Sequence, residues 1–64
     1  MRIVKFRNEL GLSQEQLAFK VGLNQSDISK LESGRRDPLS LDLRTAMKFA
    51  QVLGHTLEEV FGKP

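Results

Sequence analysis

Residues 14–33, QEQLAFKVGLNQSDISKLES, decide the fold, because they contain two short amphipathic segments separated by a glycine. Leu17, Ala18 and Val21 recur at helical spacing in the first segment, and Ile28 and Leu31 do so in the second. Each segment therefore predicts a helix with one apolar stripe. The two stripes can face a shared core, which would place the two helices against each other.

The residues between these segments favour a tight turn. Gly22 can adopt the left-handed backbone conformation that ends a helix and turns the chain sharply. Leu23 then points inward, and the Asn24 side chain can cap the amide groups that open the second helix. Ala18 is small at the point where the helices would cross, so their backbones can approach closely. These features predict a helix pair held at a fixed angle.

Glycines and capping residues divide the rest of the chain into further helices. Five glycines each follow a stretch of helical periodicity, where a C-terminal cap is expected: Gly11, Gly22, Gly34, Gly54 and Gly62. Ser13 with Gln16 and Thr56 with Glu59 have the spacing of a capping box, and Asp42 can cap another helix. These signals predict helices over residues 2–10, 14–21, 25–33, 43–53 and 57–61.

The three outer helices also carry apolar positions that can complete one core. We expect these side chains to point inward: Ile3, Phe6, Leu10, Leu43, Ala46, Met47, Ala50, Leu53, Leu57, Val60 and Phe61. Residues 35–41 are expected to form the one extended connection, because Asp37-Pro38 favours a non-helical turn. The expected fold class is all-α, a compact five-helix single domain over residues 1–64.

Length and composition limit the classes of protein. A chain of 64 residues has room for one core, and a domain of this size buries only about 60% of the surface of its unfolded chain. It has no cysteine, and no apolar run approaches the roughly 20 residues that cross a bilayer. We therefore expect a cytoplasmic protein with no membrane partner. The net charge of +2 permits nucleic-acid binding without indicating it.

The whole pattern resembles the helix-turn-helix of phage-repressor-type regulators, the Cro/CI-like or XRE family. The resemblance covers about residues 3–61. It includes Gly11-Leu12-Ser13-Gln14, Ala18, Gly22, Glu32-Ser33-Gly34 and the closing Leu57-Glu58-Glu59-Val60-Phe61. It implies a lambda-repressor-like fold in which the second and third helices form the helix-turn-helix, and it implies binding of double-stranded DNA in the major groove.

The third helix is the expected reader of DNA bases. With Ile28 and Leu31 turned inward, its opposite face and its N-terminus carry polar side chains that can bond to base edges. The candidates for base reading are Asn24, Gln25, Ser26, Ser29 and Lys30. The candidates for phosphate binding are Gln14, Ser33, Arg35, Arg36 and Arg44. We expect Asp27 to cap its own helix, because a carboxylate near phosphates is repelled.

Two further expectations come from the resemblance. Arg7 and Glu32 occupy positions at which the family has an arginine and a glutamate, which implies a partly buried salt bridge that orients the third helix. One such helix covers only a few base pairs, so a homodimer is expected, reading half-sites about one helical turn apart. Helix five supplies the candidate dimer contacts, which are Leu57, Val60 and Phe61.

Enzymatic chemistry is poorly supported by these residues. There is no cysteine nucleophile and no phosphate-binding glycine loop, and the lone His55 is best interpreted as a loop residue. We expect no cofactor, no metal and no small-molecule substrate.

The function expected from the sequence is a sequence-specific transcriptional regulator, more readily a repressor than an activator, associated with the nucleoid. The alternative is a protein-interaction module, such as an antitoxin or co-regulator, for which DNA binding is secondary. Phe19, expected to be partly exposed, and the mild net charge favour this alternative.

Overall fold

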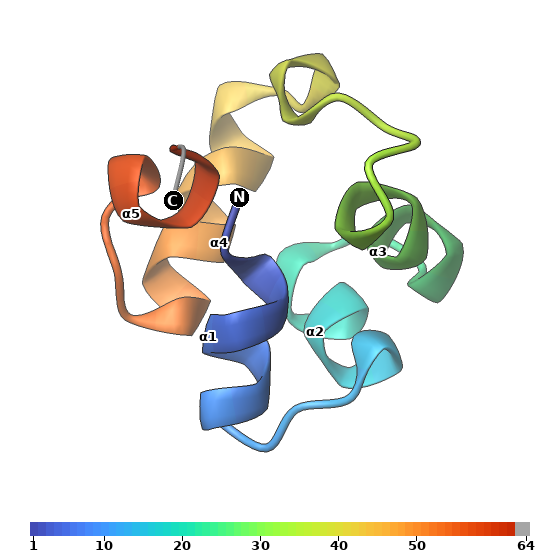
Figure 1. Ribbon diagram of the computed structural model, residues 1–64, viewed down its shortest axis with the longest axis vertical. Coiled ribbons are helices and arrows are strands. Elements are labelled where there is room, and N and C mark those ends of the chain that lie inside the picture. Colours follow the sequence, from blue (N-terminus) through green and yellow to red (C-terminus); the bar gives the residue numbers. More distant parts are fainter. Residues whose placement is uncertain (63–64) are drawn as a thin grey trace.

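Five α-helices and one short 3₁₀ helix form within residues 1–62, the part of the chain that the computed structural model describes. The α-helices are α1 (Ile3–Glu9), α2 (Gln14–Val21), α3 (Gln25–Glu32), α4 (Leu43–Leu53) and α5 (Leu57–Phe61), and the 3₁₀ helix η1 (Pro38–Ser40) lies between α3 and α4 (Figure 1). The all-α, five-helix fold is confirmed, and every helix begins and ends within one residue of its expected bounds.

Capping interactions determine where these helices begin and end. Ser13, Asn24 and Thr56 each accept a hydrogen bond from the backbone N–H of the third helical residue, whose side chain accepts one from the cap in return. Gly22 and Gly54 end α2 and α4 with φ of 78° and 73°, in the left-handed region that other residues disfavour. Because these signals are local, the bounds of the helices could be predicted from the sequence.

Ten apolar side chains, contributed by all five α-helices, are buried within residues 1–62. They are Ile3, Phe6, Leu17, Ala18, Val21, Ile28, Leu31, Phe49, Leu53 and Val60. α2 packs against α3 and α4, and α4 packs against α5. The Arg2 N–H donates to the Val60 carbonyl oxygen at 2.8 Å, so α1 and α5 lie side by side (Figure 1).

The buried face of α4 differs from the expected one. Leu43 and Met47, expected in the core, are 69% and 56% exposed, whereas Phe49 is fully buried. Both faces have helical spacing, but Phe49 packs edge-on against Phe61 of α5, with ring centroids 5.5 Å apart, and this contact selects its face. Leu10, the residue after α1, was also expected inward and lies at the surface.

The connection from α3 to α4 is not extended throughout, contrary to the expectation from Asp37-Pro38. The Asp37 side chain accepts a hydrogen bond from the Leu39 N–H at 2.9 Å, and Pro38 occupies the first helical position of η1. An aspartate cap followed by proline is a common start for a helix, so the same dipeptide begins η1.

The chain folds into a nearly spherical shape, with Cα extents of 22 × 21 × 21 Å. Among the residues described, no helix is long and apolar enough to cross a membrane.

Candidate nucleic-acid interface

The N-terminal ends of α2 and α3 meet through two glutamine side chains. Gln25 Nε2, at the start of α3, donates to Gln14 Oε1, at the start of α2, at 3.1 Å. Gln14 Nε2 donates in turn to Glu32 Oε1, in the last turn of α3, at 2.9 Å. The order of donors and acceptors fixes the orientation of both amide groups.

Glu32 is also bound to Arg7 of α1. Arg7 Nε lies 2.7 Å from Glu32 Oε2, and Arg7 Nη2 lies 3.1 Å from Glu32 Oε1, so the pair is bidentate. The two side chains are only 13% and 8% exposed. Arg7 Nη1 also donates to the Leu12 carbonyl oxygen at 2.8 Å. Both charges are thus paired and hydrogen-bonded, which offsets the loss of their hydration.

These contacts form one connected set. It runs from α1 to the last turn of α3, then to the start of α2, and ends at the start of α3. We call its four members, Arg7, Glu32, Gln14 and Gln25, the polar network. Spacing alone does not predict the two bonds of Gln14, because they join residues 11 and 18 positions apart. The network nevertheless brings together one residue expected to read bases and one expected to bind phosphate.

The remaining base-reading candidates lie along the outward face of α3. Ser26 and Lys30 are exposed, and Ser29 is partly buried. Asn24 is exposed too, but its side-chain oxygen accepts a hydrogen bond from the Asp27 N–H at 2.9 Å. While the cap is intact, the amide NH₂ group of Asn24 is available to a ligand, and its oxygen keeps one further lone pair.

Asp27 and Arg36 form a second ion pair beside α3. Arg36 Nη1 lies 2.9 Å from Asp27 Oδ1, and both side chains are partly buried. The second carboxylate oxygen of Asp27 accepts from the Asn24 N–H at 3.3 Å, which completes the capping box. The sequence reasoning missed this ion pair, because Arg36 lies beyond the end of α3. It means that the charge of Arg36 is opposed by Asp27 in the free protein.

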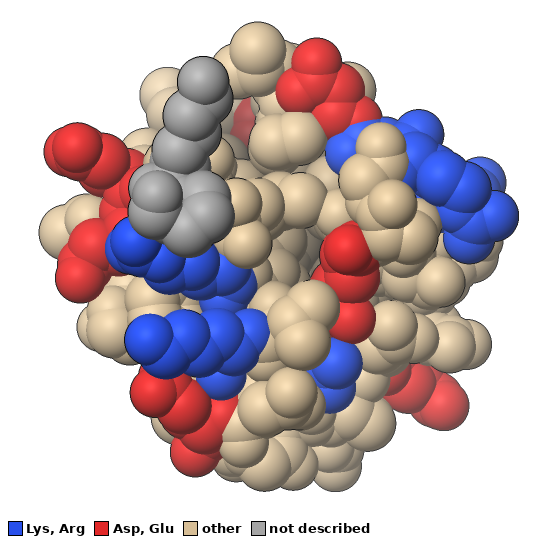
Figure 2. Space-filling model, viewed as in Figure 1, with Lys and Arg blue, Asp and Glu red and all other residues tan. Residues whose placement is uncertain are grey.

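The other phosphate-binding candidates are distributed between two places. Ser33 and Arg35 follow α3, and Arg35 Nε donates to Ser33 Oγ at 3.0 Å. Basic side chains gather over the connection from α3 to η1, at the upper right of Figure 2. Arg44 lies instead in the first turn of α4, where it lines a groove with Leu43 and Met47, and it is not part of the polar network.

The three candidates for a dimer contact differ in their exposure. Val60 is fully buried in the core, so its side chain does not reach the surface, and that expectation is corrected. Leu57 is exposed and Phe61 is partly buried. Both line a groove between η1, α4 and α5.

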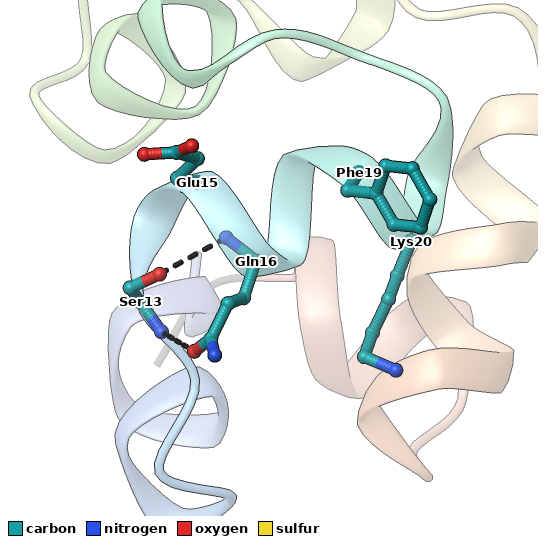
Figure 3. Close-up of a pocket in the computed structure, with 5 residues that line it drawn as sticks. All are labelled: Ser13, Glu15, Gln16, Phe19 and Lys20. Atoms are coloured by element: carbon teal, nitrogen blue, oxygen red, sulfur yellow. Dashed lines mark hydrogen bonds between the residues drawn. The ribbon is translucent and has the colours of Figure 1, made fainter.

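Phe19 lies on the outward face of α2 and is 86% exposed. Figure 3 shows a shallow depression lined by Phe19, Lys20, Glu15 and the capping box of Ser13 and Gln16. All the residues around it belong to α2 and its cap, so the depression does not enclose a small molecule in the way that ligand pockets do.

His55 packs at the turn between α4 and α5. Its ring stacks on Phe6 with centroids 3.6 Å apart, and its Nδ1 lies 3.4 Å from Glu59 Oε2. The Thr56 N–H, and then His55, lower the pKa of the Glu59 carboxyl below its ordinary value. Within residues 1–62, no group of three or more His, Cys, Asp or Glu side chains is placed to hold a metal ion.

The sequence profile of the Helix-turn-helix family matches residues 3–60 of the chain. The chain belongs to the helix-turn-helix family. The family resemblance inferred from the sequence is thereby confirmed.

Relatives of this helix-turn-helix protein occur in archaea and bacteria. It is 42% identical over 60 residues to an uncharacterized HTH-type transcriptional regulator of Archaeoglobus fulgidus, covering 94% of this chain and 81% of that protein. A regulator of the same description from Methanothermobacter thermautotrophicus is 42% identical over 60 residues, covering 92% and 83%. Another, from Haemophilus influenzae, is 36% identical over 58 residues, covering 91% and 56%. No solved structure gives a significant match.

Membership in the helix-turn-helix family implies DNA binding. In this motif the second helix lies in the major groove with its N-terminal residues at the base edges, while the first crosses the backbone. Two carboxylates of α3, Asp27 and Glu32, are each paired with an arginine. Those pairs reduce the repulsion that unpaired carboxylates would exert on phosphates.

Proposed function

We propose that this helix-turn-helix protein is a sequence-specific regulator of transcription that inserts α3 into the major groove of double-stranded DNA. The hydrogen bond from Gln25 to Gln14 carries the proposal. It uses one of the two N–H groups of the Gln25 amide and leaves the other N–H and the oxygen. Those two groups match N7 and N6 of adenine, which glutamine contacts bidentately.

Holding Gln25 in place before DNA arrives favours discrimination between sites. A free glutamine side chain must be ordered on binding, and that ordering opposes the gain from its new hydrogen bonds. Gln14 is itself fixed by Glu32, which Arg7 holds in place. The polar network therefore orients the Gln25 amide through a series of contacts that begins at the Arg7–Glu32 pair.

Ser26, Ser29 and Lys30 extend the reading surface along α3, because serine can bond to several bases and lysine can reach guanine. Gln14 has one amide N–H left for a phosphate, beside the first backbone N–H groups of α2. Ser33 and Arg35, at the other end of α3, and Arg44 supply further phosphate contacts that position the domain without reading sequence.

We infer that the protein acts as a homodimer on a palindromic operator and that it represses by occupying it. One recognition helix covers a few base pairs, so two copies related by two-fold symmetry would read half-sites about 34 Å apart. Relatives named HTH-type transcriptional regulators support a role in transcription. Repression is favoured because bound protein can block transcription machinery without a further specialised surface.

A second candidate function is favoured by the exposure of Phe19. A protein-interaction module, such as an antitoxin or co-regulator, would use this ring to contact a partner, since large exposed aromatics are common in interfaces. A Phe19→Ser variant tests the idea. Loss of a protein partner with DNA binding intact would support it, and a variant that keeps every partner would dispose of it.

The first experiment is selection of bound duplexes from a random DNA library at two salt concentrations. We expect an enriched palindrome that survives the higher salt, because base contacts are less salt-sensitive than phosphate contacts. Recovery of random DNA alone, disappearing as salt rises, would reject sequence-specific reading and leave only nonspecific electrostatic binding.

Substitution of Gln25 tests whether α3 reads the DNA bases. Gln25→Ala should reduce the preference for the selected site over a single-base variant by about 5- to 150-fold, the equivalent of one good base contact. Gln51→Ala is a matched control, because Gln51 is an exposed glutamine of α4. Equal losses on selected and random DNA for Gln25→Ala would show that this residue does not read bases.

A further inference from the structure

The hydrogen bonds of the polar network all run in one direction. Arg7 Nε and Nη2 donate to Glu32 Oε2 and Oε1, at 2.7 and 3.1 Å. Gln14 Nε2 also donates to Glu32 Oε1 at 2.9 Å, and Gln25 Nε2 donates to Gln14 Oε1 at 3.1 Å. Within the network, Glu32 therefore accepts three hydrogen bonds and donates none.

The carboxylate of Glu32 sets this direction. Both of its oxygens accept from the Arg7 guanidinium, so neither is available as a donor. Gln14 can face Glu32 only with its NH₂ group, because its carbonyl oxygen would meet another acceptor. The Gln14 oxygen is then turned toward Gln25, which must supply an N–H. Glu32 thereby determines the orientation of both amides.

The orientation of the Gln25 amide determines which base it matches. With Nε2 bonded to Gln14, the free N–H and the oxygen lie in the order that suits N7 and N6 of adenine. A reversed amide would present the same two groups in exchanged positions. Its N–H would meet the N6 amino group and its oxygen would meet N7, so both contacts with adenine would be lost. Guanine would keep one contact, because its O6 is an acceptor.

A glutamine side chain does not make this choice without a neighbour. Its last torsion angle has a broad, roughly two-fold distribution, so the oxygen and the NH₂ group can exchange places. An unrestrained Gln25 could therefore turn either group toward a given base. Discrimination between adenine and guanine requires an outside group that holds one orientation.

We propose that Glu32 is the positioning residue that sets the base preference of Gln25, by acting through Gln14 to favour adenine over guanine. Glu32 lies in the last turn of α3, whereas Gln25 begins that helix, so the two side chains are linked only by way of α2. The inference deepens the proposed function and rests on it, because it requires Gln25 to read a base.

Glu32→Gln tests the proposal by replacing one acceptor oxygen with an NH₂ group. The remaining oxygen should keep the shorter bond to Arg7 Nε, which turns the new NH₂ group toward Gln14. Gln14 then turns its own NH₂ group toward Gln25, whose amide reverses. We expect the preference for adenine over guanine, at the position where Gln25→Ala loses it, to fall by about 5- to 150-fold.

The ratio of dissociation constants for two duplexes that differ at this position is the measurement. A smaller folded fraction raises both constants equally, so the ratio does not report stability. Asp27→Asn is the matched control, because Asp27 is the other carboxylate of α3 that is paired with an arginine and it lies outside the polar network. It should leave the ratio unchanged.

An exchange of residue types separates orientation from loss of the ion pair. In the double variant Glu32→Gln/Gln14→Glu, a carboxylate at position 14 accepts from the new amide at position 32 and from Gln25 Nε2. Gln25 is then held as in wild type, so the preference for adenine should return. Affinity for every site should fall, because the carboxylate lies near phosphates. A preference that stays lost would overturn the proposal.

Gln14→Met provides a test that leaves the Arg7–Glu32 pair intact. It removes the connection between Glu32 and Gln25, so the preference for adenine should fall although the ion pair remains. Circular dichroism checks that each variant is folded. If Glu32→Gln does not fold, an unchanged preference in Gln14→Met would still overturn the proposal, because Glu32 reaches Gln25 only through Gln14.

Two results distinguish this proposal from the proposed function. If Gln25→Ala keeps the base preference of wild type, the proposed reading by Gln25 fails and the role of Glu32 fails with it. If Gln25→Ala loses the preference and folded Glu32→Gln keeps it, reading by α3 stands and only the role of Glu32 is overturned.

Discussion

The α2–α3 half of the molecule and the α4–α5 half both bury apolar side chains, but they differ in the side chains at their surfaces. In the first half, polar side chains are bonded to one another and to a partly buried ion pair, as Gln25, Gln14 and Glu32 show. In the second half, Phe49 and Val60 are buried, while the neighbouring leucines of α4 and η1 remain exposed. Hydrogen bonds fix the orientation of individual groups, whereas apolar contact mainly requires area. The proposed reading of bases would use the fixed polar groups of the first half, whereas the second half exposes apolar side chains.

The largest effect is expected in the α4–α5 half from Phe49→Ala. Removing this fully buried ring should lower the free energy of unfolding by about 3–5 kcal/mol, because it takes away apolar contact and leaves a cavity. Met47→Ala, on the exposed side of the same helix, should change it by no more than about 0.5 kcal/mol. Urea unfolding of the two variants compares them directly. Similar losses for both would mean that α4 buries a different face.

Arg7→Ala tests the α2–α3 half in the same way. It leaves Glu32 largely buried without its partner, so the free energy of unfolding should fall by about 3 kcal/mol. Arg36→Ala, which breaks the more exposed pair with Asp27, should lower it by no more than about 1 kcal/mol. An Arg7→Ala variant with the urea midpoint of wild type would show that the buried pair contributes nothing to stability.

Asp27→Asn tests whether the pairing with Asp27 keeps the charge of Arg36 from DNA. Asparagine can still accept the hydrogen bond from the Asn24 N–H, so the cap is retained, but the charge that opposes Arg36 is lost. Arg36 would then be able to neutralise a phosphate. We expect tighter binding to selected and random DNA alike, with the salt slope increased in magnitude by about one. A slope identical to that of wild type would show that Arg36 does not reach the DNA.

The smallest expected effect concerns the pH dependence of stability in the α4–α5 half. The pKa of Glu59 is lowered in the folded chain by the Thr56 N–H and by His55. A depressed pKa contributes stability that is present above the unfolded value and is lost as pH falls through the folded value. Wild type should therefore lose stability in acid more steeply than Glu59→Gln, which keeps an acceptor oxygen for Thr56. Parallel urea midpoints for the two proteins across the acid range would contradict this cause.

The bounds of the helices could be predicted because the signals that set them are local. Asn24 caps α3, and Gly22 ends α2, through contacts with residues a few positions away. The buried face of α4 could not be predicted in the same way. Its apolar residues fall on two overlapping stripes, and the choice between them depends on the contact of Phe49 with Phe61 in another helix.

The candidate interface likewise contains some features that could be predicted from the sequence and others that could not. The exposed polar face of α3 follows from helical spacing once Ile28 and Leu31 are placed inward. The pairing of Arg7 with Glu32 was inferred from family resemblance, since nothing in the spacing of two residues 25 positions apart indicates it. The bond between Gln14 and Gln25, and that between Asp27 and Arg36, depend on how separate elements pack, and they emerge only from the folded chain.

The nearly spherical shape of the domain has a consequence for the spacing of its binding sites. Cα atoms span only about 22 Å, whereas equivalent major-groove positions on one side of DNA recur about every 34 Å. Two copies centred one turn apart would therefore touch only through side chains at their edges. One base pair inserted between the half-sites would separate them by about 3.4 Å and rotate one about the DNA axis by about 34°. That displacement would break side-chain contacts between the edges of the two copies. Cooperative binding should therefore depend sharply on the spacing of the half-sites.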